Sequence, residues 1–492
     1  MDKYIRDTQP IEKVEDKKSG LFYVLYFLNI AVFLFGIYIL FRKNILPLKY
    51  RVILTLVFVI IYMVIGKILF GKNSKRILKF TAVLILVNIL LINSYVIYGL
   101  NRGLSVFKNI SSGSNAKAEY SLVVMKNSKY NTVKDLEGIK LGVPDNIQDD
   151  KLEKVLNQIK EETKVDFETE KNMDLIRLAK NLLDRDSEVI LLNESYREFV
   201  VGKYKDFSKR TRVIQKFKVE IGKKNSVPSK DVKYKESFNI YISGIDTYGD
   251  LSTVSRSDVN LILTVNPRTH KTLITSVPRD SYVRIAGDGD DEYDKLTHAG
   301  IYGIDSSIET LENFLDININ YYVKINFSSM EKIIDILGGV EVDNIEEFTS
   351  FDGHYFPKGK IILDGKKALS FSRERYALEE GEIGRGKNQE RVMVGIINKL
   401  TSSSILLNYG SLLEVISNSV ETNFNESKIV ELVNDQIETN VPWKVKTTYV
   451  KGEDRMDLTS YAMPDYDLYM LLPYEESVKE TQNLIKDTLN EK

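Results

Sequence analysis

FNIYISGIDTYG (238–249), SRSDVNLILTVN (255–266) and KTLITSVPRD (271–280) are three apolar runs, and charged residues lie at the ends of each run. Runs of four to eight Val, Ile, Leu and Thr residues bounded by turn residues are typical of buried strands. The three runs therefore predict neighbouring strands of a central sheet.

The charged residues are placed where the predicted strands begin or end. Asp246 follows the first run, Arg256 and Asp258 precede or open the second, and Arg279 and Asp280 follow the third. In open sheets of this kind, ligands bind at strand ends, where loops gather charge without burying it. Carboxylates and arginines on neighbouring strand ends suit a divalent cation and a phosphate group; the alternative is a set of ordinary solvated loop charges.

The rest of the large domain, residues 238–490, alternates short apolar runs with helical patterns, which predicts an α/β sandwich. Strands are expected at Tyr321–Ile325, Val340–Val342 and Ile361–Leu363. Helices are expected at Lys295–Gly303, Ser306–Phe314, Phe327–Leu337, Gly365–Phe371, Asn388–Leu400, Ile405–Ser417 and Glu426–Ile437, with a capping segment at Asp465–Leu472.

Three apolar stretches precede the soluble part of the chain: Leu21–Phe41, Val52–Phe70 and Ile77–Leu100. Each is long enough to cross a hydrocarbon core roughly 30 Å thick at about 1.5 Å per residue. No cleavage pattern of small residues separates them, which argues against a removed signal peptide. We predict a cytoplasmic tail (1–20) and an uncleaved anchor of three transmembrane helices (21–100).

The distribution of basic residues predicts the orientation of this anchor only weakly, because lysines and arginines flank the spans on both sides. With the amino terminus inside, three spans place everything after Leu100 outside the cell.

Between the anchor and the large domain, we expect a linker at 101–118, a small α/β accessory domain at 119–221 and a second linker at 222–237. Strands are predicted at Ser121–Met125, Ile139–Val143 and Val189–Leu192, and helices at Lys151–Lys160 and Leu175–Asp184. No arginine cluster or glycine-rich phosphate loop occurs in this part of the sequence, so the expected role is accessory or interaction.

Composition excludes several kinds of chemistry. The 492 residues include no cysteine and three histidines (His270, His298 and His354), so disulfides and thiolate sites are excluded and histidine-rich zinc sites are disfavoured. The formal net charge of −1 gives no basic field for nucleic acid, and we expect no nucleic-acid partner.

A second charged cluster follows the helix predicted at Gly365–Phe371. It contains Arg373, Arg375, Arg385, Asn388, Gln389 and Arg391. The planar guanidinium fork of arginine matches phosphate oxygens bidentately, so converging arginines suit a pyrophosphate. The alternative is a surface helix on which glutamates such as Glu374 and Glu382 pair with these cations.

The motifs SGIDT, SRSD, SVPRD, KLTHAG, LGGVEV, FSRERY and GRGKNQ, in this order, resemble the LytR-CpsA-Psr family over Phe238 to about Leu400. The three-span anchor, the accessory domain and the tail MDLTSYAMPD resemble the capsule-cluster members of that family. The resemblance implies an α/β/α sandwich with a mixed central sheet.

The resemblance also implies an enzyme activity: a phosphotransferase that moves capsular or other secondary wall polysaccharide from undecaprenyl pyrophosphate to peptidoglycan. The expected product is a phosphodiester, formed without a covalent enzyme intermediate. The expected place is the outer face of a Gram-positive membrane, with other capsule-assembly proteins as further partners.

Site residues follow from the matched motifs. Asp246 and Asp258 match the magnesium ligands of the family, so the expected cofactor is Mg²⁺, with Mn²⁺ as an alternative. The expected catalytic residues are Arg256, Arg279, Asp280, Arg373 and Arg375. The expected pyrophosphate contacts are Arg256, Arg279, Lys295, Arg373, Arg375, Arg385 and Gln389. Asp280 is either a base or a partner that holds Arg279.

The sequence departs from the commoner family pattern at Glu382 and Asn388, where many members have aspartate and arginine. Two other functions remain open at this point: a membrane-anchored regulator or scaffold of capsule assembly without chemistry, and a lipid pyrophosphatase that uses water as the acceptor.

Overall fold

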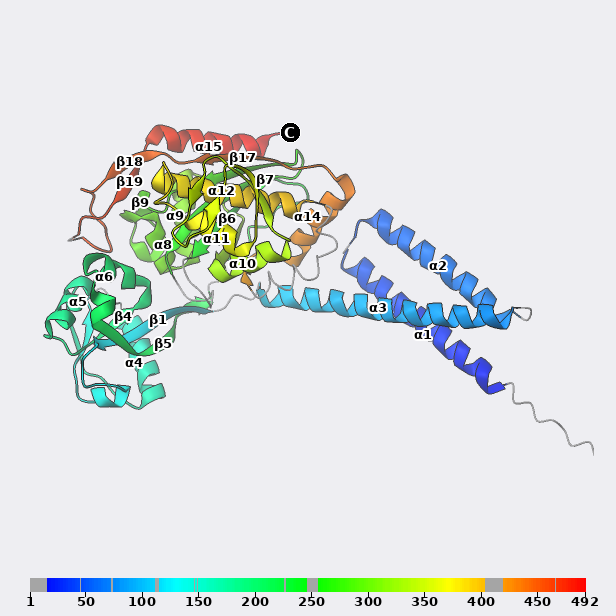
Figure 1. The fold of residues 1–492 in the computed structure, drawn as a ribbon, viewed down its shortest axis with the longest axis horizontal. Helices are drawn as coiled ribbons and strands as arrows, with labels where there is room; N and C mark the ends of the chain where they lie inside the picture. The colour runs from blue at the N-terminus through cyan, green and yellow to red at the C-terminus, as the bar shows by residue number, and fades with distance from the viewer. Residues whose placement is uncertain are drawn as a thin grey trace, which may run out of the picture. The chain divides into compact units, whose positions relative to one another are not determined.

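The structure is a computed structural model, and it describes residues 16–44, 46–71, 74–110, 115–145, 147, 149–224, 227–245, 255–402, 419–464 and 466–492. The chain forms two compact units (Figure 1): residues 1–105 with 426–440, and residues 106–425 with 441–492.

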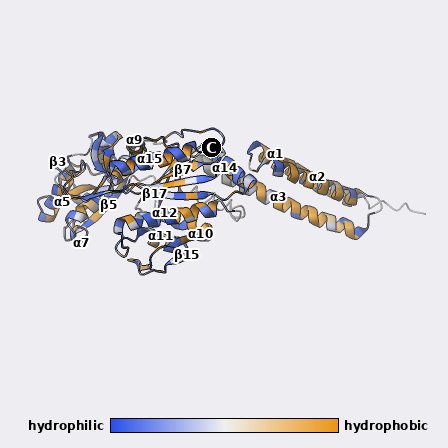
Figure 2. Ribbon diagram, turned by 90° about the horizontal axis from the view of Figure 1, so that it is seen from above, coloured by the Kyte–Doolittle hydropathy of each residue, from blue (hydrophilic) through white to orange (hydrophobic). Residues whose placement is uncertain are grey.

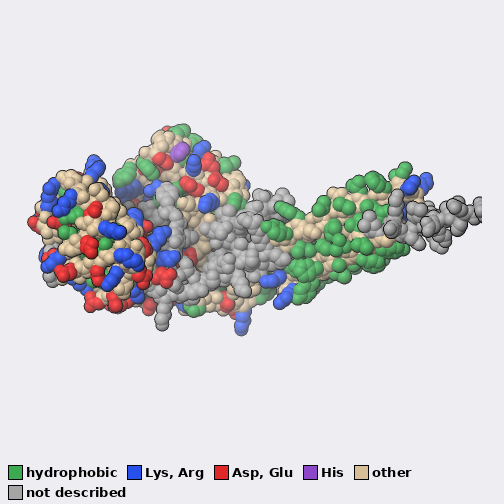
Figure 3. Space-filling model, turned by 90° about the horizontal axis from the view of Figure 1, so that it is seen from below, with side chains coloured by type: hydrophobic (Ala, Val, Ile, Leu, Met, Phe, Trp, Pro, Cys, Tyr) green, Lys and Arg blue, Asp and Glu red, His purple; other side chains and the backbone are tan. Residues whose placement is uncertain are grey.

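The first unit contains α1 (Asp16–Arg42), α2 (Leu48–Phe70), most of α3 (Arg76–Ile110) and α14 (Glu426–Thr439). Helices α1 to α3 contain the segments Phe22–Arg42, Leu48–Phe70 and Arg76–Tyr98, which are long and apolar enough to cross a membrane. These helices are hydrophobic along most of their length (Figure 2), and many of their apolar side chains lie on the surface (Figure 3), as in helices that face lipid. A narrow buried seam joins them, made of Phe33, Tyr62, Ile65, Leu69, Ala82 and Leu86.

The segment expected as a linker at 101–118 consists largely of regular secondary structure. Helix α3 continues to Ile110, and the first strand of the accessory domain begins at Asn115. Extending an existing helix costs far less than nucleating one, so Gly103 and the polar residues around it do not end α3. The second linker also begins later than expected, because strand β5 (Thr211–Lys224) extends to Lys224.

The accessory domain is a five-stranded sheet in the order β3-β2-β4-β1-β5. Strand β1 (Asn115–Met125) is antiparallel to β4 (Val189–Asn193) and to β5. Strand β2 (Leu141–Pro144) is parallel to β3 (Thr169–Met173) and to β4. Because side chains alternate along a strand, β1 supplies Leu122 and Val124 to one apolar core and Val123 to another.

Short helices cover this sheet: α4 (Asp149–Thr163), α5 (Leu175–Asp184), α6 (Arg197–Lys203) and α7 (Phe207–Arg210), with 3₁₀ turns η1 (Val133–Leu136) and η2 (Glu194–Tyr196). Helix α5 has the predicted bounds, because the Asp174 carboxylate caps it by accepting hydrogen bonds from the backbone of Ile176 and Arg177.

The large domain is built on a six-stranded mixed sheet in the order β16-β11-β6-β7-β8-β17. Its strands are β6 (Phe238–Ile245), β7 (Ser257–Asn266), β8 (Lys271–Ser276), β11 (Tyr321–Asn326), β16 (Glu421–Thr422) and β17 (Lys444–Tyr449). Strands β11, β6, β8 and β17 point the same way, and β7 and β16 run against them.

Helices lie on both faces of the sheet, which confirms the predicted α/β/α sandwich. One face packs on α8 (Leu296–Tyr302), α9 (Ile304–Leu315) and α15 (Glu475–Asn490) through Tyr241, Ile262 and Leu273. The other face carries α10 (Phe327–Ile336), α11 (Gly365–Arg373) and α12 (Gly381–Leu400).

Four two-stranded sheets extend the large domain: β9 (Tyr282–Ile285) with β10 (Glu292–Lys295), β12 (Val340–Asn344) with β15 (Gly359–Leu363), β13 (Phe348–Thr349) with β14 (Tyr355–Phe356), and β18 (Gly452–Arg455) with β19 (Met470–Pro473). A 3₁₀ turn, η3 (Gly287–Gly289), joins β9 to β10. The sequence patterns did not predict β9, β10, β13, β14, β16, β17, β18, β19 or α15. The helix expected at Ile405–Ser417 lies outside the described residues.

Candidate active site

The predicted strand ends meet at one edge of the central sheet. Asp258 lies at the start of β7, and the register pairs Ser257 with Ile245 and Leu261 with Ser276. The start of β7 therefore lies between the carboxyl ends of β6 and β8. The loop after β8 carries Arg279 and Asp280 to the same place.

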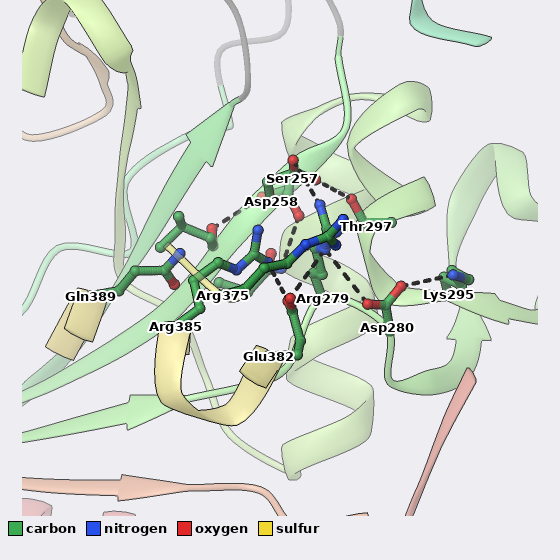
Figure 4. A network of polar contacts seen from close by, with 12 residues as sticks. Ser257, Asp258, Arg279, Asp280, Lys295, Thr297, Arg375, Glu382, Arg385 and Gln389 are labelled. Carbon is green, nitrogen blue, oxygen red and sulfur yellow. Dashed lines mark hydrogen bonds and ion pairs between the residues drawn. The ribbon is translucent and has the colours of Figure 1, made fainter. Parts of the chain in front are cut away.

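Arg279 is the centre of a network of three carboxylates (Figure 4). Its Nη1 atom lies 3.0 Å from Oδ2 of Asp258, and its Nε atom lies 3.4 Å from Oε1 of Glu382 and 3.5 Å from Oδ2 of Asp280. The second oxygen of Asp258 accepts a hydrogen bond of 3.0 Å from the hydroxyl of Thr297 on α8. Segments far apart in the sequence thus hold one guanidinium group.

Two further cations close this network. The Lys295 ammonium donates to Oδ1 of Asp280 over 2.8 Å and lies 5.8 Å from the ring centre of Tyr469. The Arg385 guanidinium on α12 pairs with the same Glu382 carboxylate that contacts Arg279. Asp280 is therefore placed between Lys295 and Arg279, which favours a holding role for this carboxylate over that of a base.

The electrostatics of the network favour ionised carboxylates. Burial alone would raise the pKa of Asp258, but the charges of Arg279, Arg256 and Arg385 outweigh it and lower the pKa. Burial would lower the pKa of Arg279, and Asp258, Asp280 and Glu382 raise it instead. Burial and the neighbouring Arg279 lower the pKa of Arg385, which still remains a cation because the ordinary pKa of an arginine lies far above neutral.

The second predicted arginine cluster lines a cavity next to this network. Arg373, the last residue of α11, has its guanidinium 4.3 Å from the ring centre of Phe327 and 5.5 Å from that of Phe351. The Arg375 guanidinium lies 4.4 Å from the ring centre of Tyr376. The Gln389 amide donates to the backbone carbonyl of Ser372 over 3.3 Å.

Glu374, between the two arginines, fixes the loop that carries them. Its buried carboxylate accepts four backbone hydrogen bonds, from Phe351 (2.6 Å), Arg375 (3.0 Å), Tyr376 (2.8 Å) and Ala377 (2.9 Å). The expected alternative, in which Glu374 neutralises surface arginines, is wrong for this residue, because backbone amides occupy both oxygens. Sequence analysis missed this role; the only signal was an acidic residue between two arginines.

The cavity, of about 350 Å³, has one polar end and one apolar wall. Its polar residues include Asp258, Arg279, Arg373, Arg375, Arg385 and Gln389. Its apolar wall comes from the sheet and from helices α10, α11 and α12, through Ile242, Leu261, Ile325, Met330, Leu369, Val392, Met393 and Ile396. A cavity with converging cations at one end and hydrocarbon along its length suits an amphiphile with an anionic head.

The predicted site residues therefore divide into three groups. Those that lie in the network or line the cavity are Asp258, Arg279, Asp280, Lys295, Arg373, Arg375, Arg385 and Gln389. Arg256 lies close enough to lower the pKa of Asp258, and its guanidinium is 5.7 Å from the ring centre of Phe199. Asp246 lies outside the described residues.

Asn388 points away from this site. Its buried side chain donates to the carbonyl of Phe371 over 3.2 Å and accepts from Arg391 over 2.6 Å. Asn388, which stands where many family members have arginine, therefore contributes to the packing of α12 against α11. Among the described residues, no group of three or more His, Asp or Glu side chains is placed to hold a metal ion.

Comparison with known proteins identifies relatives of the large domain. The LytR_cpsA_psr family model matches residues 199–471, more than half of the chain. A second model, described as a DNA polymerase processivity factor, matches residues 74–192, which run from α3 into the accessory domain.

Relatives of this chain bear the name polyisoprenyl-teichoic acid–peptidoglycan teichoic acid transferase TagU. The protein from Enterococcus faecalis is 37% identical over 278 residues, which cover 56% of this chain and 86% of the relative. The protein from Bacillus cereus is 40% identical over 209 residues, 42% of this chain and 67% of the relative. The crystal structure of Bacillus subtilis TagU aligns with 52% of this chain and 99% of its own, at 30% identity and a TM-score of 0.42.

Proposed function

Because this chain belongs to the LytR-CpsA-Psr family, we propose that it is a membrane-anchored enzyme that transfers a polyisoprenyl-linked glycopolymer to peptidoglycan. Relatives 37% to 40% identical to it are named as transferases of that kind, and the match covers most of their length. The observation that carries the proposal is the cavity whose polar end gathers four arginines and whose wall is hydrocarbon.

The donor we propose is a polyprenyl pyrophosphate that carries the glycan. Arg279, Arg373, Arg375 and Arg385 line the polar end of the cavity, and guanidinium groups bind phosphate oxygens bidentately, so several of them together suit a pyrophosphate. The prenyl chain would lie along the wall formed by residues such as Met330, Leu369 and Ile396. This assignment gives the arginines and the apolar wall one common ligand.

In the reaction, a hydroxyl of the acceptor attacks the phosphorus that bears the glycan. The bond from this phosphorus to the bridging oxygen breaks, polyprenyl phosphate leaves, and the hydroxyl proton passes to a base or to solvent. The arginines stabilise the charge that develops on the leaving phosphate; losing one such contact typically costs about a hundred- to a thousandfold in rate. Asp280 and Glu382 hold Arg279 and Arg385 in position for this.

A magnesium ion is part of the proposal. Mg²⁺ is usually bound by one or two carboxylates together with substrate phosphates. Asp258 fits, because its carboxylate is ionised and lines the polar end of the cavity, and Asp246 is proposed as the second ligand from the sequence motif alone. When bound, the ion would neutralise phosphate charge and make the leaving group better.

We further propose that the glycopolymer is a capsular or similar secondary wall polysaccharide and that both folded domains lie outside the cell. The three apolar helices and the accessory domain support this, because they match the organisation of capsule-cluster members. An outward placement also puts the site on the side of the membrane where peptidoglycan lies.

The test uses the full-length protein in detergent, a short glycan on undecaprenyl pyrophosphate, and a peptidoglycan fragment, with and without Mg²⁺. We expect metal-dependent joining of glycan to fragment, which Asp258→Ala abolishes and Asp305→Ala, at an exposed carboxylate on α9, leaves intact. Release of free phosphorylated glycan alone would show a pyrophosphatase. Tight lipid binding without turnover would show a scaffold.

A further inference from the structure

The accessory domain packs against the large domain through helix α6 and the residues beside it. One apolar cluster contains Leu182, Val200 and Phe207 of the accessory domain together with Met463 of the large domain. The Lys203 ammonium lies 4.6 Å from the ring centre of Tyr466, and Lys151 pairs with Asp288 over 3.0 Å. The two domains thus share an apolar cluster with polar contacts around it.

Phe199, on α6, reaches the predicted phosphate site from this interface. Its ring meets that of His298 edge to face, with the centres 4.8 Å apart, and its ring centre lies 5.7 Å from the guanidinium of Arg256. A guanidinium within about 6 Å of an aromatic ring centre is attracted to the ring. The accessory domain therefore supplies a direct contact to one of the arginines predicted to bind the pyrophosphate.

The position of Phe199 is itself well defined. The Nδ1 atom of His298 lies 2.9 Å from Oδ1 of Asp294, and both side chains are buried. Asp294 also accepts hydrogen bonds from the hydroxyl of Ser460 (2.7 Å) and the backbone of Ala462 (2.9 Å). The surface on which Phe199 rests is thus fixed by a buried polar network.

The backbone of Arg256 is held by α8, the same helix that carries His298. A Cβ atom at Gly300 would lie 2.5 Å from the carbonyl oxygen of Ser255 and 2.6 Å from the amide nitrogen of Ser257. Only glycine allows this approach, so the helix fits directly against the backbone on both sides of Arg256. The α8 helix thus packs on the backbone of Arg256, and Phe199 contacts its guanidinium.

We propose that the accessory domain completes the phosphate-binding site, with Phe199 as a positioning residue that holds Arg256 toward Asp258 and the pyrophosphate. An arginine side chain loses much rotamer freedom when it binds, and a ring that already restricts it lowers this cost. The inference rests on the proposed function, because Arg256 needs a phosphate ligand for its position to matter.

The experiment measures two quantities for full-length variants: the affinity for geranylgeranyl pyrophosphate and the kcat/KM of glycan transfer. Phe199→Leu should lower both about three- to thirtyfold, the range expected for one cation–ring contact. Phe199→Tyr, which keeps the ring, should retain both. Tyr466→Leu removes a cation–ring contact elsewhere in the same interface and should leave both unchanged.

A double-mutant cycle separates positioning from general loosening of the interface. In an Arg256→Gln background, Phe199→Leu should cause no further loss of affinity, because the residue through which it acts is gone. An equal loss in both backgrounds, or an equal loss in Tyr466→Leu, would overturn the inference while leaving the proposed function intact. A wild-type protein that neither binds the pyrophosphate nor transfers glycan would overturn the proposed function itself.

Discussion

The Nη1 atom of Arg279 lies 3.0 Å from Oδ2 of Asp258, and the same guanidinium contacts Asp280 and Glu382. Three carboxylates around one cation leave net negative charge at this point, and Lys295 and Arg385 offset it from either side. The network resembles a preassembled support, in which carboxylates orient the cations that face the cavity.

Arg279→Lys should abolish most of the activity while the protein still folds. A lysine ammonium keeps the charge but has no planar fork, so it cannot contact three carboxylates and a phosphate at once. We expect transfer to fall about a hundredfold or more and the free energy of unfolding to fall by about 1 to 3 kcal/mol. Arg284→Lys, at an exposed arginine on β9, is the matched control. Near wild-type transfer by Arg279→Lys would show that Arg279 does not contact the substrate.

Glu390 on α12 should make the stability of the protein depend on pH. Its side chain is 4% exposed, and burial raises its pKa from 4.5 to about 7 despite a hydrogen bond with Thr447 and the nearby charges of Arg391 and Lys387. The folded state therefore holds a proton that the unfolded state releases between about pH 4.5 and pH 7. The stability linked to this proton is present below pH 4.5 and is lost as the pH rises through 7.

Glu390→Gln should remove this dependence, because the amide stays neutral. At about 1.4 kcal/mol per pKa unit, the variant should be more stable than wild type by about 2 to 4 kcal/mol at pH 8 and nearly equal to it at pH 4. Chemical unfolding at several pH values measures the difference, with Glu309→Gln at an exposed glutamate on α9 as the control. A difference that does not change with pH would contradict the buried, protonated carboxyl.

Met393→Trp should narrow the apolar part of the cavity and discriminate between donors by chain length. Met393 lies on α12 and lines the cavity with Met330 and Ile396. The indole ring of tryptophan is larger than the methionine side chain, so it would exclude a long prenyl chain from this wall but would leave room for the pyrophosphate head. We expect transfer from an undecaprenyl donor to fall at least about tenfold more than transfer from a geranyl donor. Met393→Leu, which nearly conserves volume, should treat both donors as wild type does. Equal losses for the two donors would show that the chain does not lie along this wall.

Much of the fold follows from local patterns, and the exceptions have physical causes. The strands β6, β7 and β8 are predictable because each is a long apolar run with polar ends. Helix α12 was expected from Asn388 but begins at Gly381, because three glycines in its first turns hide the helical pattern. One of them, Gly384, packs closely on Leu378, so its small size serves a contact that the sequence does not reveal.

The candidate site was predictable in its residue types but not in its pairings. The motifs identified Asp258, Arg279 and Arg385, and the structure places them together. The four backbone bonds of Glu374 and the contact of Phe199 with Arg256 could not be predicted, because each depends on segments that meet only in the folded chain. The local sequence shows which chemical groups are present, whereas the partners of each side chain depend on how the chain folds.

The proposed orientation predicts which introduced cysteines react outside intact cells. The chain has no cysteine, so single substitutions give an unambiguous signal. Asp186→Cys, at an exposed position after α5, should react with a membrane-impermeant maleimide in cells whose wall admits the reagent. Lys75→Cys, exposed just before α3, should react only after the membrane is permeabilised, because one span separates its loop from the folded domains. The reverse pattern would place the site on the cytoplasmic side, away from peptidoglycan, and would contradict the transfer that we propose.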